Sequence, residues 1–377
     1  MCVEFDRRAL QRMGGIRRGF AMLVLAVALS GPVSLKVPGA SADPKPGGGD
    51  LFNETISIEA RRLDGFARMS TATSHRYGKL DFRGGLVLTS PSNHFGGWSG
   101  LEIDPDGRRI LAVSDAGAWL TAELIYEGQR LKGIKGSRIG PILALGGKRL
   151  AGERDRDAEG VRLLEGTLAK GSLLIAFEQN HRVGRFEISD KGMSQPTGYV
   201  KKAAEWGRMI RNKSMESVAV IRGGPAKGAI VAFAERMIDS SGQHTGWIWP
   251  GGIGGDPQRL SLRRIGDFDI TDAASLPDGS LVILERSFAW LSGVKMRMRK
   301  IAASDVRAGT VFDGDVLIEA DMSYELDNME GLAIHQAKNG ESILTLISDN
   351  NFNNFLQRTL ILQFALAGEK VTAAAPR

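Results

Sequence analysis

The chain has 377 residues, of which 42% are hydrophobic and 48 are glycine, so it can bury a large core and make many turns. Residues 1–42 hold six of the 49 basic and two of the 43 acidic residues, so the formal charge of +6 falls to +2 beyond them. A nearly neutral protein gives no electrostatic support to nucleic-acid binding, and none is predicted.

Residues 1–42 have the features of a secretory signal peptide. Arg17 and Arg18 precede an apolar run at residues 20–29, and Ala-Ser-Ala at residues 40–42 provides a cleavage site. The apolar run is too short to span a membrane as a stable helix. The arginine pair leaves both the Sec and the twin-arginine route open. The predicted location is therefore the periplasm or the extracellular medium, with no membrane attachment after cleavage.

The rest of the chain is predicted to consist of strands and turns. Residues 43–54 are rich in proline and glycine and are predicted to form a linker, and residues 370–377 a tail. The predicted domain spans residues 55–369. It opens with strand-like segments at residues 55–63 and 80–89.

One pattern then occurs five times. In each unit a serine or carboxylate enters an apolar strand, a turn containing glycine follows, and a second strand ends at another carboxylate. The units begin at residues 99, 159, 216, 272 and 330, a spacing of 56 to 60 residues. Further strand-like segments follow, giving about four strands per unit, which is typical of a β-propeller.

The fold class is therefore predicted to be all-β, with a β-propeller architecture. Six blades are favoured, because the length of the mature chain divided by the period gives nearly six. One irregular blade would contain strands from both termini, so that the ring closes and hides its edges. Five blades closed by the N-terminal strand at residues 80–89 are the alternative.

Antiparallel pairing places the first and last carboxylate of each unit at the same face of the propeller. The carboxylates expected there are Glu159, Glu216, Asp272, Glu330, Asp115, Glu178, Glu235, Glu285 and Asp349. Such a group repels itself and needs cations, protons or basic partners. The neighbouring basic residues are Lys213, Arg236 and Arg286. Alternatively, these acids only hold the ring together by bonding backbone amides or arginines of adjacent blades.

Oxygen ligands favour calcium at this face. Ca²⁺ takes six to eight oxygen ligands, and Asn180 and Asn350 add amide oxygens to the carboxylates, whereas one histidine, His181, and no cysteine suit zinc poorly. The predicted metal ligands are Asp115, Glu159, Glu216, Glu235, Asp272 and Glu285. The nearby Asp155 and Asp157 do not match an EF-hand and are expected to lie in a solvated turn.

No nucleotide-binding, zinc-protease or serine-hydrolase motif occurs. Segments such as FGGWSGLEIDPDG, FEQNHRVGRFEI, TGWIWPGG, DNMEGLAIH and LTLISDNNFN resemble the bacterial phytase-like family, whose description is "esterase-like activity of phytase". The resemblance spans about residues 85–366 and implies a secreted propeller that hydrolyses phosphate or carboxyl esters. The motif positions that it marks as site candidates are Glu159, Glu178, Asn180, His181, Glu330, Asp349 and Asn350.

Two functions are predicted. The first is a calcium-dependent hydrolase of small anionic esters, monomeric and secreted. Its assigned catalytic residues are Glu178, His181, Glu330 and Asp349, and its assigned substrate-binding residues are Asn180, Lys213, Arg236, Arg286 and Asn350. The second is a non-catalytic propeller that binds a ligand, glycan or protein on the same face.

Overall fold

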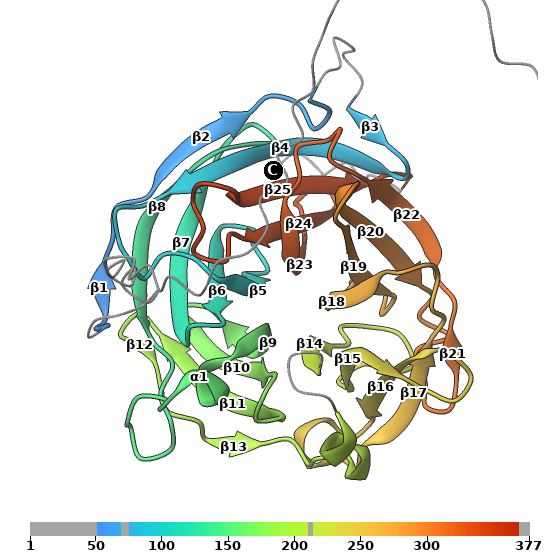
Figure 1. The fold of residues 1–377 in the computed structure, drawn as a ribbon. Helices are drawn as coiled ribbons and strands as arrows, with labels where there is room; N and C mark the ends of the chain where they lie inside the picture. Colours follow the sequence, from blue (N-terminus) through green and yellow to red (C-terminus); the bar gives the residue numbers. More distant parts are fainter. Residues whose placement is uncertain (1–50, 69–74, 210–213, 369–377) are drawn as a thin grey trace, which may run out of the picture. The chain divides into compact units, whose positions relative to one another are not determined.

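Runs of valine, isoleucine, leucine and aromatic residues, which favour strands, fill most of the chain. The structure, a computed structural model, describes residues 51–68, 75–209 and 214–368, which all belong to one compact unit, residues 45–377. The predicted signal peptide, the predicted tail and Lys213 lie outside the described residues. Those described form 25 strands in five sheets arranged as the blades of a propeller (Figure 1).

Blades 1 to 4 run in chain order, each from an inner strand outward. Blade 1 contains β5 (Trp98–Ile103), β6 (Arg109–Ser114), β7 (Ala118–Glu127), β8 (Arg130–Pro141) and β1 (Glu54–Thr55). Blade 2 contains β9 (Ala158–Thr167), β10 (Lys170–Phe177) and β11 (Arg182–Ser189), with β12 (Gly192–Met193) and β13 (Gly198–Tyr199) on β11. Blade 3 contains β14 (Met215–Val220), β15 (Ile230–Ile238), β16 (His244–Trp249), β17 (Gln258–Leu262) and β21 (Val311–Phe312). Blade 4 contains β18 (Asp269–Ser275), β19 (Leu281–Ala289), β20 (Gly293–Ile301) and β22 (Asp315–Ala320).

Blade 5 joins the two ends of the described chain. Its strands, from the inside outward, are β23 (Asn328–Gln336), β24 (Ser342–Asp349), β25 (Thr359–Leu366), β4 (Leu80–Thr89) and β2 (Glu59–Leu63), with β3 (Arg76–Tyr77) on β4. The prediction of a β-propeller is confirmed, and the five-bladed alternative closed by the strand at residues 80–89 is the arrangement observed. The described residues form no sixth blade, because the N-terminal strands extend blades 1 and 5. Residues 51–54, the last four of the predicted linker, belong to this extension, since Leu51 is buried and β1 pairs with β8.

The inner strands contact one another in a closed ring, β5 to β9, β14, β18, β23 and back to β5. Apolar side chains fill the spaces between blades. Between blades 2 and 3, Trp206 packs edge-on against Trp247 and Trp249, with ring centroids 5.8 Å apart in both pairs. Trp206 lies in η1 (Ala204–Arg208); the other short helices are α1 (Glu153–Arg156) and η2 (Gly252–Gly254). No helix among the described residues is long and apolar enough to cross a membrane.

A buried arginine crosses the centre of the ring. Arg162 of β9 donates hydrogen bonds to the carbonyl oxygens of Ala273 in β18 (2.8 Å) and Leu101 in β5 (2.6 Å). It also forms an ion pair of 2.7 Å with Asp272, and both side chains are almost completely buried. One side chain thus links three inner strands across the propeller axis.

Candidate functional site

Each inner strand carries a β-bulge at the same place near its start. The ladders skip Glu159 in blade 2, Glu216 in blade 3 and Glu330 in blade 5. The same position is held by Ser99 in blade 1 and Thr271 in blade 4. Bulges re-aim side chains and occur often beside functional sites. Here they place three glutamates at one end of the ring.

The second strand of each blade adds a charged residue at that end. In blade order, the equivalent positions are Asp115, Glu178, Glu235, Arg286 and Asp349. Antiparallel pairing sets these positions beside the bulges. We call this end the carboxylate mouth. Its acids are Asp115, Asp157, Glu159, Glu178, Glu216, Glu235, Glu330 and Asp349.

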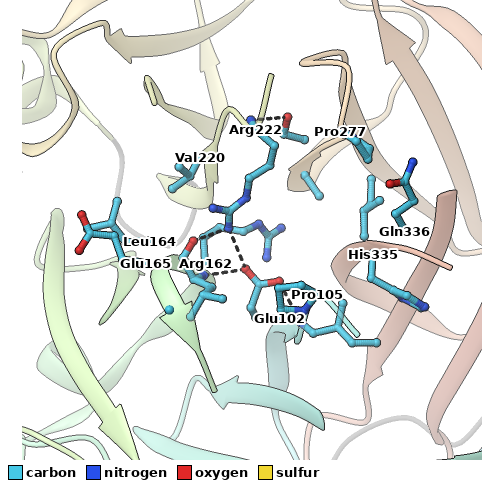
Figure 2. A pocket seen from close by; sticks show the side chains of 16 residues that line it. Glu102, Pro105, Arg162, Leu164, Glu165, Val220, Arg222, Pro277, His335 and Gln336 are labelled. Carbon is cyan, nitrogen blue, oxygen red and sulfur yellow. Dashed lines mark hydrogen bonds and ion pairs between the residues drawn. The ribbon is translucent and has the colours of Figure 1, made fainter. Parts of the chain in front are cut away.

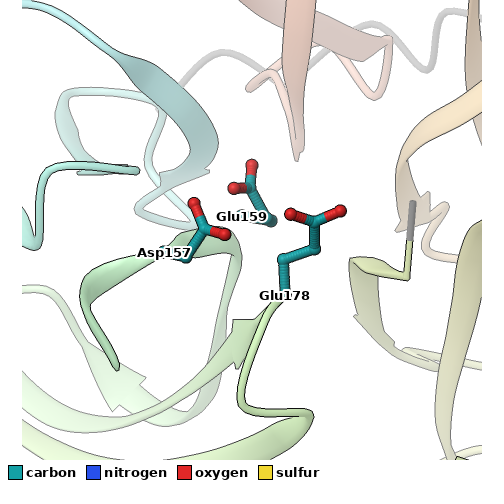
Figure 3. Close-up of side chains that lie close together, drawn as sticks. All are labelled: Asp157, Glu159 and Glu178. Carbon is teal, nitrogen blue, oxygen red and sulfur yellow. The ribbon is translucent and has the colours of Figure 1, made fainter. Parts of the chain in front are cut away.

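The acids converge. Figure 3 shows the carboxylates of Asp157, Glu159 and Glu178 turned toward a shared space, with one oxygen of each within 4.8 Å of the others. Glu178, Glu216 and Glu235 form a second group within the same limit. Because Glu178 belongs to both groups, five carboxylates form one continuous set.

Burial and mutual repulsion raise the carboxyl pKa values at this mouth. Burial first, and then the charge of Asp157, raises the pKa of Asp115 to about 6. Burial and repulsion by Asp157 raise that of Glu178 to about 8. Burial, with repulsion by Asp115, raises that of Asp349 to about 8. Glu178 and Asp349 therefore hold protons at neutral pH unless a cation replaces them, whereas Asp115 is mostly ionised there.

The same two causes act on the remaining acids of the mouth. Burial raises the pKa of Glu235 to about 7, with a further contribution from Asp269. The pKa values of Glu159 and Glu216 lie well above their ordinary value because both are buried among other carboxylates. Burial also raises the pKa of Glu330, although Arg286 opposes the shift.

Arg286 is the cation placed among these acids. Its guanidinium lies 2.6 Å from Glu330 and 3.7 Å from Glu235, and it donates a hydrogen bond to Asn328. Arg236, assigned to substrate binding from the sequence, is instead engaged with Asp269, to which its Nε donates at 2.6 Å. Among the described residues, Glu159 and Glu216 have no hydrogen-bond or ion-pair partner for their carboxylates, although each side chain is about nine-tenths buried.

Two predicted metal ligands lie elsewhere, which corrects their assignment. Asp272 follows the bulge instead of occupying it, and its carboxylate pairs with Arg162 and accepts the Leu332 backbone amide at 2.7 Å. Glu285 is fully buried and accepts hydrogen bonds of 2.6 to 3.2 Å from Arg297 and Arg299. In blade 4, the positions equivalent to the acids of the other blades are taken by Thr271 and Arg286.

Asp157 was expected to lie in a solvated turn, and that expectation is wrong. Its side chain is half-buried, and one oxygen, Oδ2, is buried without a partner among the described residues. The missed signal was the spacing to Glu159, because residues two apart at the start of a strand point to the same side.

His181 and Asn180 lie in the turn after β10. The His181 Nδ1 donates to the Glu178 carbonyl oxygen, which leaves Nε2 as the acceptor of the neutral ring. Burial lowers the pKa of His181, so the ring is neutral at pH 7. Asn180 donates to Asp155 at 3.0 Å. Both residues thus lie beside Glu178, as predicted from the sequence.

Asn350, assigned to substrate binding, is instead a buried turn residue. Its Oδ1 accepts the backbone amides of Gly97 and Phe352, both at 3.2 Å, and its Nδ2 donates to Asn354 at 2.6 Å. The side chain is fully buried. It supports the loop that follows Asp349 and offers no atom to a ligand.

The donor set fits a hard cation. It consists of oxygens, it is buried, and it includes an orphaned oxygen on Asp157 and the unpaired carboxylates of Glu159 and Glu216. Calcium prefers several carboxylate oxygens in flexible geometry. The acids of the two groups that share Glu178 are therefore suitable ligands for calcium.

One comparison with known proteins identifies the family of the chain. The model of the family Phytase-like, described as "Esterase-like activity of phytase", matches residues 93–352, more than half of the chain. No curated protein matches the chain. An endo-arabinase from Bacteroides thetaiotaomicron VPI-5482 is 12% identical with a TM-score of 0.43, covering 71% of this chain and 93% of its own. The Cps50 (Swd1) β-propeller domain from Myceliophteria thermophila is 9% identical with a TM-score of 0.38, covering 83% and 100%. At these values the structural likenesses carry no argument about function.

Proposed function

We propose that this chain, which belongs to the phytase-like family, is a calcium-dependent hydrolase of phosphate or carboxyl esters that acts at the carboxylate mouth. The observation that carries the proposal is a charge imbalance. Eight carboxylates with raised pKa values or unpaired oxygens converge there. The cations near them in the described residues are Arg286, which pairs with Glu330, and Arg236, whose charge is already balanced by Asp269. A structural salt-bridge network has matched charges, whereas this arrangement needs added positive charge.

Five acids would hold calcium: Asp157, Glu159, Glu178, Glu216 and Glu235. When bound, calcium would neutralise these carboxylates and polarise the ester oxygen. Glu178, as the member common to both groups, is the ligand whose loss should matter most.

Other side chains would move protons and bind the substrate. His181 is neutral, and its Nε2 is a free acceptor, so it is suited to take a proton from an attacking water. Asp349, with its pKa raised to about 8, is protonated at neutral pH and is suited to give a proton to the leaving oxygen. Glu330 positions Arg286, whose remaining N–H groups would bind an anionic ester oxygen.

A non-catalytic propeller that binds a ligand at the same mouth is the second candidate. One observation favours it: Glu178 and Asp349 each accept a backbone amide, from Ser214 at 3.1 Å and Asn351 at 2.7 Å. These hydrogen bonds give both acids a structural role that does not require catalysis. In either case we propose a monomer located in the periplasm or outside the cell.

The test is calcium dependence. The purified protein would be stripped with chelator, and its melting temperature and its hydrolysis of p-nitrophenyl phosphate and p-nitrophenyl butyrate followed as Ca²⁺ is restored. We expect both stabilisation and turnover of one ester, and loss of turnover without unfolding in Glu330→Gln and Asp349→Asn. Arg263→Gln, at an exposed ion pair with Asp313, is the matched control. Stabilisation without turnover would support the binding propeller, and no response to calcium would overturn the metal site.

A further inference from the structure

A cavity lies on the propeller axis, at the end opposite the carboxylate mouth. All five blades contribute to its lining through the far ends of their inner strands or the turns that follow, and its volume is about 450 Å³. This is within the range of pockets that bind small molecules. We call it the distal pocket. Figure 2 looks into it and labels Glu102, Arg162, Val220, Arg222 and His335 among its lining residues.

The floor of the distal pocket is Arg162, whose N–H groups are already used. They bond the carbonyl oxygens of Ala273 and Leu101 and the carboxylate of Asp272. The pocket is therefore separated from the carboxylate mouth by a neutral, hydrogen-bonded pair. A ligand that enters it meets its own set of groups.

Arg222 supplies the free donors of the distal pocket. Its Nη2 donates to the Leu163 carbonyl oxygen and lies 3.9 Å from Glu102, too far for a hydrogen bond. Among the described residues, its Nε and Nη1 have no hydrogen-bond partner, and the side chain is 38% exposed toward the pocket. A guanidinium with free N–H groups is matched to a carboxylate, which it binds in a fork.

The neighbouring acids form no hydrogen bond with these donors, although Glu102 lies within ion-pair distance of Arg222, at 3.9 Å. Glu102 accepts the backbone amides of Ile103 at 2.8 Å and Leu163 at 2.6 Å, one with each oxygen. Glu165 points away from the centre of the pocket in Figure 2. The nearby charge of Glu102 disfavours a doubly charged phosphate more than a singly charged carboxylate.

The wall residues of the distal pocket indicate the chemical character of the part of the ligand that does not contact Arg222. Their apolar part is formed by one residue from each blade, namely Pro105, Leu164, Val220, Pro277 and Ile334. We propose that the distal pocket binds a small organic carboxylate, with the carboxylate group on Arg222 and an apolar body against these side chains. The geometry that points to it is the juxtaposition of one partly free guanidinium with an apolar wall built by all five blades.

The test uses three six-carbon probes of similar size and inorganic phosphate, and it is independent of the proposed hydrolase. Hexanoate, hexanamide, hexylamine and inorganic phosphate would be titrated into the calcium-free protein, with binding followed by calorimetry and by competition with phenylacetate. We expect saturable 1:1 binding of hexanoate and phenylacetate, weaker binding of hexanamide, and none of hexylamine or phosphate. Equal binding of all four, or no binding of either carboxylate, would overturn the proposal.

Three variants test whether the carboxylate binds in the distal pocket. Arg222→Met should weaken carboxylate binding about tenfold or more, because it removes a charge-assisted hydrogen-bond pair. Leu164→Trp, which fills the wall, should also weaken it, while Glu165→Gln should leave it unchanged because that side chain points away. Unchanged binding by both Arg222→Met and Leu164→Trp would place the ligand elsewhere. Circular dichroism and melting curves verify that each variant is folded, and ester hydrolysis should stay at the wild-type level in all three.

Discussion

The carboxylate mouth and the axial brace formed by Arg162, Asp272 and Glu102 use the same residue types in opposite ways. Each oxygen of Asp272 and Glu102 accepts a backbone amide, and each acid bonds an amide of the next blade, Leu332 or Leu163. Glu159 and Glu216, equally buried, lack such partners among the described residues. Burial and acidity therefore do not identify a functional carboxylate. Glu159 and Glu216 differ from the acids of the brace in having no hydrogen-bond donor among the described residues.

The largest effect expected is on the brace. Arg162→Met leaves Asp272 buried without its counter-charge, which should reduce the free energy of unfolding by about 3–5 kcal/mol, measured by denaturant titration. Calcium should not restore it. The double variant with Asp272→Asn should be less destabilised than Arg162→Met alone, since it also removes the stranded charge. A small loss in the single variant would show that the two regions do not differ as described.

The next effect concerns Glu178, the acid common to both groups at the mouth. Glu178→Gln should lower ester hydrolysis about 100-fold or more, because it removes the carboxylate shared by both groups of the cation site. It should also abolish stabilisation by calcium while the calcium-free protein stays folded. Thermal melts with and without calcium measure this. Retention of calcium stabilisation would show that the cation lies elsewhere.

Two glutamate-to-glutamine variants, one in the axial brace and one at the carboxylate mouth, compare the two regions directly. Glu102→Gln should destabilise the protein by about 1–3 kcal/mol, because an amide side chain replaces one of two bonded acceptors and leaves a backbone N–H unsatisfied. Glu216→Gln should instead leave the calcium-free protein equally stable or more stable at pH 8, because it removes repulsion. Chemical denaturation in chelator compares the two. Equal losses would mean that both acids are structural.

The last effect is the pH dependence of the calcium-free protein. The pKa values of Asp115, Glu235 and Glu178 in the folded protein, about 6, 7 and 8, lie above their ordinary values of 3.8 and 4.5. Unfolding therefore releases protons, so stability is full below about pH 4 and falls as the pH rises toward 8. The melting temperature should follow this trend. Saturating calcium should flatten it, and a rise in stability across the same range would contradict the raised pKa values.

The repeat predicted the fold because period and strand alternation are local properties. The blade number depended on where the N-terminal segments pair. The strand Leu80–Thr89 pairs with β25, and the strand Glu54–Thr55 pairs with β8. These strands extend two existing blades, but the division of chain length by period counted them as a sixth blade. Pairing partners so far apart leave no pattern in a single sequence.

Most acids of the carboxylate mouth were placed at this end of the propeller from the sequence, but the two chosen in blade 4 lie elsewhere. Asp272 and Glu285 lie one residue away from the positions of the ring, now held by Thr271 and Arg286. A shift of one residue in a strand turns the side chain to the other face. The position of the bulge decides the register, and the sequence around it, Ile-Thr-Asp, offered two polar residues for one place. Arg286, whose charge partly balances the carboxylate mouth, thus directly follows Glu285, the acid that was wrongly predicted to be a metal ligand.

The closing blade has a consequence for biosynthesis. Leu80 pairs with Leu366, so β4 finds its partner only after nearly 290 further residues have been made. Until β25 is available, four blades stand with open strand edges, which are templates for aggregation. Pairings across such a distance also form slowly. A chain truncated before residue 359 should therefore remain dependent on chaperones, however complete its first four blades are.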